Sequence, residues 1–531
     1  MNKHIKCVSI ALLFFSLLIL GLNSYRQYGI SWDDPFQRLT GAVTVNYLAK
    51  RFNVLAFLAS QYESVPPLNT YKDRDYGVAF EAPAFALEQL LRLTDYRDIY
   101  MFRHLLIFLA SLGGVWAVYS LSCRRFSNWR IGLLSALFLV LTPRLFAESF
   151  YNSKDIVFMA AFAVAMNTTI SLVLKPSMKT ALLNALASAF AIDVRLMALL
   201  LPIVSVAVLI TRLIRHELSL RTIYLVLGIY VITTCALVVA MWPYLWSDPF
   251  RNFVQAFKHM AHFRWNFEVR YVGAFIRATA LPWHYTLTWI SVTTPLLYLA
   301  SFLVGVFATC RQICARRLKL WQNDAELQDI IFAVLVCAPI AAVSFMHSVL
   351  YDGWRQMYFV YPAFLLVATK GWMALWSMQS NYNAYRGTLI ALTTISVVYT
   401  AMWMWNAHPL QGVYFNVLAG QNVKARYDMD YWGVGNRKAL EYILAHDHSP
   451  VINVWGDSWT PLVFSLLILK SDDRNRIKLA NAKLAANYVV TNYRGVKDTN
   501  NSSYGRDYDV FYEIRVDNEL VLSVFKWRES R

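Results

Sequence analysis

Apolar residues are concentrated in eleven runs along the chain, and polar stretches separate these runs. Most of the runs have the length that an α-helix needs to cross the hydrocarbon core of a bilayer. Two short neighbouring runs around Asp193 and Arg195 are also consistent with one bent span. The pattern predicts a polytopic α-helical membrane protein of about 11 spans. The runs are Cys7–Leu22, Leu105–Cys123, Ile131–Ala147, Ile156–Leu174, Ala181–Ile192, Leu196–Thr211, Thr222–Leu245, Tyr285–Thr309, Ile330–His347, Met357–Trp376 and Thr388–Trp405.

Three long polar segments lie between or after these runs. In Asn23–His104, apolar residues recur at helical spacing from Phe36 to Leu48, which predicts helices that lie at the membrane surface. Trp246–His284 is a second large loop. Residues 406–531 form a polar tail, and we expect residues 1–405 to be the membrane domain that includes the first loop, 23–104. In the tail, strand-like runs (Val451–Trp455, Tyr488–Thr491, Leu520–Trp527) and helical patterns (Asn436–Ala445, Asn481–Ala486) predict a small α/β domain.

Composition agrees with a membrane protein, because 57% of the 531 residues are hydrophobic and the mean hydropathy is +0.38. The net charge of +17 does not indicate a nucleic-acid-binding protein, because its basic residues gather in alternate short loops. This positive-inside pattern predicts a multi-pass protein of the inner (plasma) membrane with a cytoplasmic N-terminus and a periplasmic or extracytoplasmic C-terminus. Cys7–Leu22 precedes no small-residue cleavage site, so we expect an uncleaved first span. The basic loop residues are Lys3, Lys6, Arg124, Arg125, Arg130, Lys175, Lys179, Arg212, Arg215, Arg221, Arg311, Arg316, Arg317 and Lys319.

The first candidate for chemistry is the acidic pair Asp33-Asp34, which follows the first span directly. Trp32 suits the headgroup layer, and Pro35 suits the first turn of a helix. A carboxylate at the membrane face can act as a general base toward a lipid-borne substrate. The alternative is that the pair caps the helix that follows, a position that Asp favours.

Two further outer segments carry charges beside the membrane. Glu148, Lys154 and Asp155 lie in a short segment between the third and fourth runs, and Arg355 opens the tenth. Ionisable residues at such depths are costly and tend to be functional. Arg355 at a helix start suits a phosphate, which a guanidinium binds through two parallel hydrogen bonds. The alternatives are that Asp155 caps its helix, Lys154 snorkels and Arg355 is an ordinary interfacial arginine.

We expect no metal site and no cofactor. Asp428-Met429-Asp430 has the DxD pattern of nucleotide-sugar transferases, but it lies in the outer tail and suits a structural or acceptor-side role. His259, His262 and His284 have no acidic partner at a fixed spacing.

Several short motifs occur in a consistent order over nearly the whole chain. They are Tyr28–Pro35, Tyr76–Glu81, Ser149–Asp155, Trp242–Pro249, Leu281–Tyr285, Asp352–Arg355, Tyr414–Asn416 and Asp430–Gly433. In these stretches the chain resembles the GT-C superfamily of polyprenol-phosphate-dependent glycosyltransferases. The most similar branch is the family 39-like group, which includes protein O-mannosyltransferases and the lipid A aminoarabinose transferase.

The resemblance implies a GT-C fold and an inverting transfer of a sugar from a polyprenyl-phosphate donor to a glycan, lipid or protein acceptor. Asp33 would be the catalytic base, and Asp34 stands where the family usually has Glu. The donor phosphate would contact Lys154 and Arg355, and the substrate would contact Trp32, Tyr76, Glu81 and Asp155. Membrane lipid is a further expected partner, and nucleic acid is not.

Other classes of function remain open at this point. Asp193 and Arg195 are consistent with a buried ion pair on the path of a transporter or flippase. The same fold also suits an O-antigen ligase or polymerase that takes a diphosphate-linked glycan, or a non-catalytic protein that binds a lipid-linked sugar.

Overall fold

The structure is a computed structural model, and it describes residues 2–59, 65–261, 263, 265–316, 320–378, 383–497, 504 and 507–528. His262, which the sequence offers as a metal ligand, lies outside these residues, as do the loop residues Arg317 and Lys319.

A helix occupies every apolar run that the sequence defines. Nine helical segments of the described residues are long and apolar enough to cross a membrane, and the pair α5 and α6, bent by 69°, gives a tenth. Helix α8 has 17 residues and occupies the remaining run. The segments are α1 (Asn2–Ser24), α4 (Tyr96–Phe126), α5 (Trp129–Val140), α6 (Pro143–Tyr151), α7 (Asp155–Leu174), α8 (Met178–Val194), η2 (Leu196–Leu199) with α9 (Leu200–Ile214), α10 (Leu220–Met241), α12 (Tyr285–Thr293) with α13 (Leu296–Ala315), α14 (Asp324–Phe345), η4 (Arg355–Val360) with α15 (Tyr361–Met378), and α16 (Asn383–Ala407).

The short pair α8 and α9 is an antiparallel hairpin and not one bent span. The chain turns at Arg195, whose backbone is extended. Asn184 of α8 then lies 3.4 Å from the Ser205 hydroxyl of α9. Near the far end of the hairpin, Arg212 bonds to the Val173 carbonyl at the end of α7. Residues 181–211 therefore run along the bundle twice.

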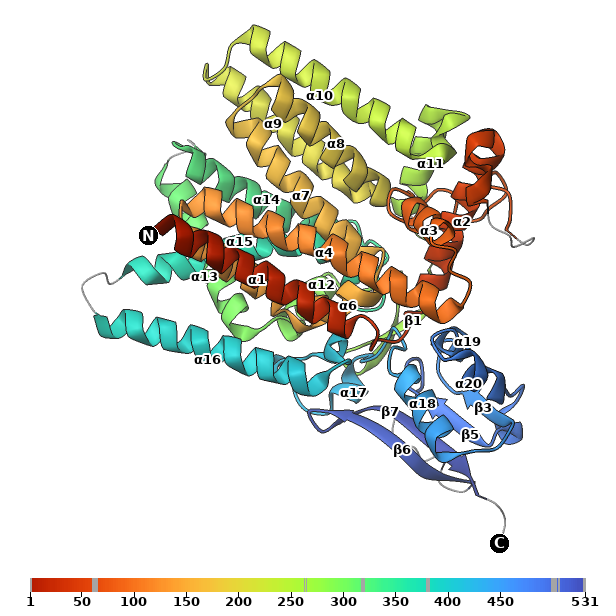
Figure 1. Cartoon of the computed structure of the whole chain (residues 1–531). Coiled ribbons are helices and arrows are strands. Elements are labelled where there is room, and N and C mark those ends of the chain that lie inside the picture. The colour runs from red at the N-terminus through yellow and green to blue at the C-terminus, as the bar shows by residue number, and fades with distance from the viewer. Residues whose placement is uncertain are drawn as a thin grey trace.

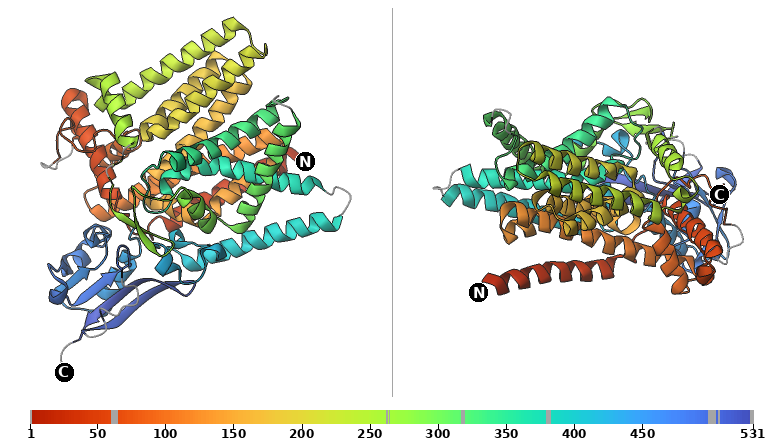
Figure 2. Two further views of the ribbon diagram at one scale, coloured as in Figure 1. Left: turned by 180° about the vertical axis from the view of Figure 1, so that it is seen from behind. Right: turned by 90° about the horizontal axis from the view of Figure 1, so that it is seen from above.

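The helices lie side by side, with the N-terminus at one end of the bundle and the C-terminal domain at the other (Figures 1 and 2). Helices α7 and α15 are mostly buried, whereas α1, α10 and α16 present apolar side chains such as Phe15, Ile232 and Trp405 outward. Exposed apolar faces of this kind suit contact with lipid. The arrangement confirms a multi-pass membrane protein.

The two large loops gather at the end of the bundle that carries the C-terminal domain (Figure 1). The helix expected in the first loop is present as α2, but much of it is buried, because Gly41 lets it approach the Glu81 carbonyl of α3 closely. The elements of these loops are α2 (Asp34–Arg51), η1 (Asn53–Leu58) and α3 (Glu81–Leu90), then η3 (Pro243–Trp246), α11 (Pro249–Ala261), β1 (Glu268–Tyr271) and β2 (Ala274–Arg277).

The C-terminal segment folds around a five-stranded sheet of order β4-β3-β5-β7-β6. Strand β3 is parallel to β4 and β5, whereas β7 is antiparallel to β5 and β6. The three expected strands and the helix α18 are present, but the expected helix Asn481–Ala486 is only a short 3-10 turn, η7. The elements are η5 (Gln411–Val413), η6 (Val417–Ala419), α17 (Val423–Arg426), α18 (Asn436–His446), β3 (Ile452–Gly456), α19 (Leu462–Leu466), α20 (Ser471–Arg476), β4 (Ile477–Leu479), η7 (Lys483–Ala485), β5 (Tyr488–Thr491), β6 (Tyr508–Val516) and β7 (Glu519–Trp527).

Candidate active site

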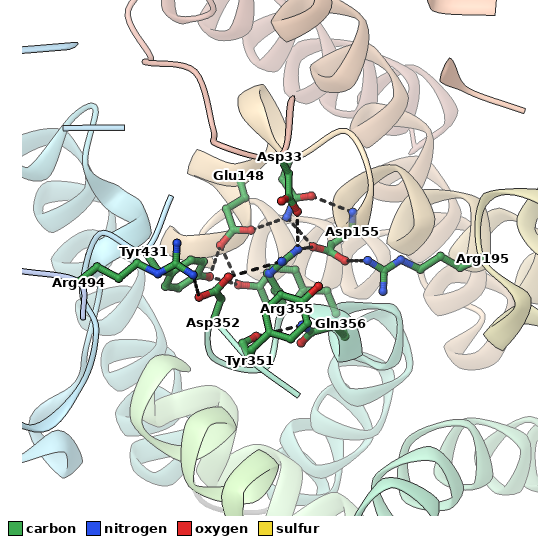
Figure 3. Close-up of polar contacts among 12 residues, drawn as sticks. Asp33, Glu148, Asp155, Arg195, Tyr351, Asp352, Arg355, Gln356, Tyr431 and Arg494 are labelled. Carbon is green, nitrogen blue, oxygen red and sulfur yellow. Dashed lines mark hydrogen bonds and ion pairs between the residues drawn. The ribbon is translucent and has the colours of Figure 1, made fainter. Parts of the chain in front are cut away.

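Arg355 lies at the centre of a charged cluster where the membrane helices meet the outer loops (Figure 3). It begins η4, directly after a turn in which Asp352 and Gly353 both have positive φ angles, of 54° and 74°. The turn brings the Asp352 carboxylate back toward the Arg355 guanidinium, and the two lie 3.5 Å apart. The local sequence Asp-Gly suits this conformation, because both residues tolerate left-handed backbone.

Three carboxylates surround the Arg355 guanidinium. Its Nη1 lies 3.1 Å from Asp33 Oδ2 and 3.0 Å from Asp155 Oδ2, and Asp352 takes the side of Nη2. The faces of the guanidinium lie against the Tyr351 and Trp432 rings, at 4.8 Å and 4.5 Å from the ring centres. Arg355 is therefore already charge-balanced by the protein, and it fixes the carboxylates around it.

Asp33 differs from the other carboxylates of this cluster in its exposure. Its side chain is 22% exposed, whereas those of Asp155 and Asp352 are 1% and 2% exposed. Asp33 occupies the N-cap position of α2, but its side chain makes no capping hydrogen bond and turns to Arg355 instead. Asp33 is thus the carboxylate of the cluster that a substrate can reach most easily.

Asp155, at the start of α7, is held from several sides. Arg195 bonds to its Oδ1, Arg355 to its Oδ2, and the Asn152 amide donates to Oδ2 at 3.1 Å. Asn152 also accepts the backbone N–H of Asp155 at 2.8 Å, and this bond fixes the start of the helix. The alternative in which Asp155 is a simple helix cap does not describe this side chain, which joins two arginines.

Lys154 lines a small pocket beside the cluster, together with two other residues that the sequence singled out, Tyr76 and Glu81. Its ammonium lies 3.4 Å from the centre of the Tyr76 ring. Burial, helped by the Arg195 charge and opposed by Asp33 and Asp155, lowers the pKa of Lys154 to about 8. Lys154 remains mostly cationic at neutral pH. The pocket is lined by Gln37, Tyr76, Gly77, Phe80, Glu81, Ser153, Lys154 and Val194.

Asp34 lies in a different environment from its neighbour Asp33. It is buried near Arg103, at 3.7 Å, and that arginine also bonds to Glu81. Burial, with smaller contributions from the Glu81 and Asp33 charges and opposed by Arg103, raises the pKa of Asp34 to about 7. The two acids therefore face different partners, and a catalytic role for Asp34 stays a prediction.

The structure gives partners to Glu148, which the sequence singled out without a role, and adds Arg494, which the sequence did not single out. Glu148 accepts hydrogen bonds from Tyr358 at 2.8 Å and from Tyr431 at 2.9 Å, so it joins the helices to the C-terminal segment. Arg494 of the C-terminal domain bonds to Asp352. No local pattern marks Arg494, because its partner is far away in the chain.

Asp193 and Arg195 do not form the ion pair that the transporter alternative offered. Asp193 Oδ1 accepts the backbone N–H groups of Val78 and Ala79, and Arg195 bonds to Asp155. Asp193 therefore fastens the first outer loop to the end of α8. The two charges are close in the chain but serve different contacts.

No group of three or more potential metal ligands occurs among the residues that the structure describes. Asp430 accepts the backbone N–H of Gly435 at 2.8 Å, and Asp428 lies 3.7 Å from Arg270. His259 bonds to Asp75 at 2.6 Å. Asp430 thus holds the turn of its own segment, and Asp428 joins that segment to Arg270 of β1.

No family model matches the sequence, and no curated protein matches it. Among solved structures, ArnT from Cupriavidus metallidurans in the apo state is 14% identical, and the match covers 99% of this chain and 98% of that one with a TM-score of 0.51. The same ArnT bound to undecaprenyl phosphate gives 14% identity, coverages of 97% and 98%, and a TM-score of 0.51. The chain has the fold of ArnT.

The comparison agrees with the architecture that the sequence predicted, a polytopic helical membrane part followed by a small C-terminal α/β region. A further match is the archaeal oligosaccharyltransferase AglB from Archaeoglobus fulgidus in complex with an inhibitory peptide and a dolichol-phosphate. It is 12% identical, covers 90% of this chain and 69% of that one, and has a TM-score of 0.44.

Proposed function

We propose that the protein is an inverting glycosyltransferase that moves a sugar from a polyprenyl-phosphate donor to a glycan, lipid or protein acceptor. The observation that carries the proposal is the placement of Asp33, a partly exposed carboxylate held by Arg355 beside a pocket that contains Lys154. The fold supports it, because ArnT matches over nearly the whole of both chains and one of its structures holds undecaprenyl phosphate.

In the proposed reaction, Asp33 accepts the proton of an acceptor hydroxyl. The hydroxyl oxygen forms a bond to the anomeric carbon while the bond from that carbon to the phosphate oxygen breaks, which inverts the anomeric centre. The polyprenyl phosphate leaves with the bonding electron pair. Cations placed at the leaving oxygen stabilise this developing charge.

We assign the phosphate first to Lys154, with Arg195 behind it. Lys154 faces the pocket, and the Arg195 Nε has no hydrogen-bond partner among the described residues. Arg355 was the sequence-based candidate for the phosphate. Since its Nη1 is shared by Asp33 and Asp155, its proposed part is to orient the base and to add positive potential to the site.

The proposed orientation places the N-terminus in the cytoplasm and the C-terminal domain outside the inner (plasma) membrane. The N-terminus and the turn between α9 and α10, which carries Arg215, lie at one end of the bundle, and the C-terminal domain, whose Arg494 contacts the cluster, lies at the other (Figure 1). A periplasmic site suits a donor whose lipid anchor enters between helices and whose phosphate stays at the membrane face.

The test uses purified protein in lipid nanodiscs with synthetic undecaprenyl-phosphate sugars, and envelope membranes from cells that lack the protein supply the acceptor. Release of undecaprenyl phosphate is the readout, because this product is common to all sugars and acceptors. We expect release by the wild-type protein and not by Asp33→Asn. Release of undecaprenyl diphosphate from diphosphate-linked donors, with no release from monophosphate donors, would favour a ligase or polymerase. Movement of intact donor without release of either lipid phosphate would favour a flippase.

A further inference from the structure

Arg494 brings a charge from the C-terminal domain into the candidate active site. Its side chain is 4% exposed, and its Nη2 donates to Asp352 Oδ1 at 2.6 Å. Its guanidinium also lies 4.7 Å from the centre of the ring of Trp32, the residue directly before Asp33. A buried guanidinium with so short a contact is a strongly directed interaction.

The backbone around Arg494 is fixed in a way that aims this side chain. Tyr493 and Gly495, its two neighbours, both have positive φ angles, of 62° and 73°. The Asn492 amide donates to the Asp430 carbonyl at 2.8 Å, and the Arg494 carbonyl accepts from the backbone N–H of Trp459 at 3.1 Å. The backbone of the loop after β5 is therefore fixed by hydrogen bonds, and it directs the Arg494 side chain toward the membrane part.

Arg494, Asp352, Arg355 and Asp33 form a chain of alternating charge across three separate parts of the molecule (Figure 3). Asp352 lies between two guanidiniums, at 2.6 Å from Arg494 and 3.5 Å from Arg355. The closer partner satisfies most of its charge. Without Arg494, the buried Asp352 has Arg355 as its remaining guanidinium partner, and that arginine also holds Asp33.

We propose that Arg494 is a positioning residue that keeps Asp352 from drawing Arg355 away from Asp33, so that the seated C-terminal domain completes the site. The inference rests on the proposed function, since it concerns the placement of the base. Other charged or titratable groups that face this chain are Asp155, Lys154, Asp428 and the Tyr285 hydroxyl. They remain in place in every variant below.

The experiment compares release of undecaprenyl phosphate by Arg494→Met, Asp352→Asn and the double variant. We expect Arg494→Met to lower kcat about tenfold with little change in the KM for the donor, because contacting charges couple with energies that correspond to several-fold to hundredfold effects. In the double variant, the neutral amide that replaces the Asp352 carboxylate no longer competes for Arg355. We therefore expect kcat to return to within about threefold of Asp352→Asn alone.

Arg437→Met is the matched control. Arg437 is another arginine of the C-terminal segment that reaches the membrane part, where it donates to the backbone carbonyls of Arg26 and Tyr28 at 2.7 Å and 2.8 Å. It helps to seat the segment but does not touch the charge chain. We expect Arg437→Met to lower the melting temperature. Any loss of kcat in this variant should not be restored by Asp352→Asn.

Arg494→Lys should recover part of the loss, since it keeps the charge but not the guanidinium geometry. If Arg494→Met does not fold, the same comparison is made with Arg494→Lys. An active enzyme in which Asp352→Asn fails to rescue the Arg494 variant overturns the inference and leaves the proposed function standing. A wild-type protein that releases no undecaprenyl phosphate overturns the proposed function and the inference together.

Discussion

Two buried charge clusters stand at opposite ends of the helix bundle and differ in how completely they are satisfied. At the end away from the C-terminal domain, Asp329 of α14 receives two bonds from Arg125, at 2.5 Å and 2.6 Å, and one from Lys370 at 2.8 Å. Lys370 uses its other donors on Thr309 and Gln312. One carboxylate is thus enclosed by two cations, and it ties α4, α14 and α15 together.

The cluster around Arg355 is less completely hydrogen-bonded. Several of its buried polar atoms, including Arg355 Nε and Ser153 Oγ, have no hydrogen-bond partner among the described residues, and Asp33 is partly exposed. In the Asp329 cluster the carboxylate and both cations are bonded, and the Gln312 amide nitrogen has no partner among the described residues. A bonded ion cluster stabilises packing, whereas several unsatisfied polar groups in a native structure call for another role. The comparison supports the proposal that the second cluster is the reaction site, with the first as a structural tie.

The largest effect that the comparison predicts is on Asp33. Asp33→Asn keeps the size of the side chain but removes the base, so turnover should fall at least ~100-fold. The protein should still elute as a monodisperse species with a melting temperature close to wild type. The control is Asp98→Asn, an exposed acid at the start of α4, which should leave turnover unchanged. Near-normal release of undecaprenyl phosphate by Asp33→Asn would remove it from the mechanism.

An Asp-to-Asn substitution in the Asp329 cluster should lower stability. Asp329→Asn leaves Arg125 and Lys370 without their carboxylate, and the loss of one partner from a buried ion pair costs about 3 kcal/mol or more. Turnover for each folded molecule should stay within about twofold of wild type. Thermal unfolding in detergent and an activity titrated against folded protein measure the two quantities. A loss of turnover like that of Asp33→Asn would break the comparison.

Lys154 should determine donor affinity. Lys154→Met should raise the KM for the donor about tenfold, an effect of roughly 1.4 kcal/mol. The pKa of Lys154 is lowered to about 8, so its positive charge is present below this pH and is lost above it. Donor binding by wild type should therefore weaken as pH rises through about 8. Donor binding by Lys154→Met should not show this pH dependence. If the same pH dependence of donor binding persists in Lys154→Met, it arises from the titration of another group.

Asp34 should affect stability more than turnover. Its pKa is raised to about 7 in the folded protein, above the ordinary value of an unfolded Asp. Its contribution to stability is therefore complete below pH ~4 and is lost as pH rises through about 7. Asp34→Asn should reduce the fall in melting temperature between pH 5 and pH 8 by about 2–4 °C. Turnover at least tenfold lower in Asp34→Asn would instead support a catalytic role.

The smallest expected effect is that of chelation. The base, the pocket and the leaving-group cations of the proposed mechanism need no divalent metal, so turnover should persist in excess EDTA. Loss of turnover that Mg²⁺ or Mn²⁺ restores would make the carboxylates around Arg355 metal ligands. Asp33 would then no longer be a free base.

Much of the site could be read from the sequence, because its residues stand at the ends of apolar runs. Asp33, Lys154, Asp155 and Arg355 all follow or open a span, and the structure brings them into one cluster. Glu81 and Tyr76 line the neighbouring pocket. What local pattern could not supply is the partner of each charge: Asp193 and Arg195, two positions apart, bind different partners.

The sequence by itself determined the helices of the membrane part, the α/β tail and the positions of the charges along them. Apolar runs and helical periodicity are local properties, so they can be recognised in the sequence without knowledge of the tertiary structure. Only the tertiary structure decided that adjacent Asp33 and Asp34 face different arginines, and that Arg494 reaches Asp352 across 142 positions. The partner of a charged side chain depends on long-range packing and on which side chains are removed from water. Neither property can be inferred from the neighbouring residues in the sequence.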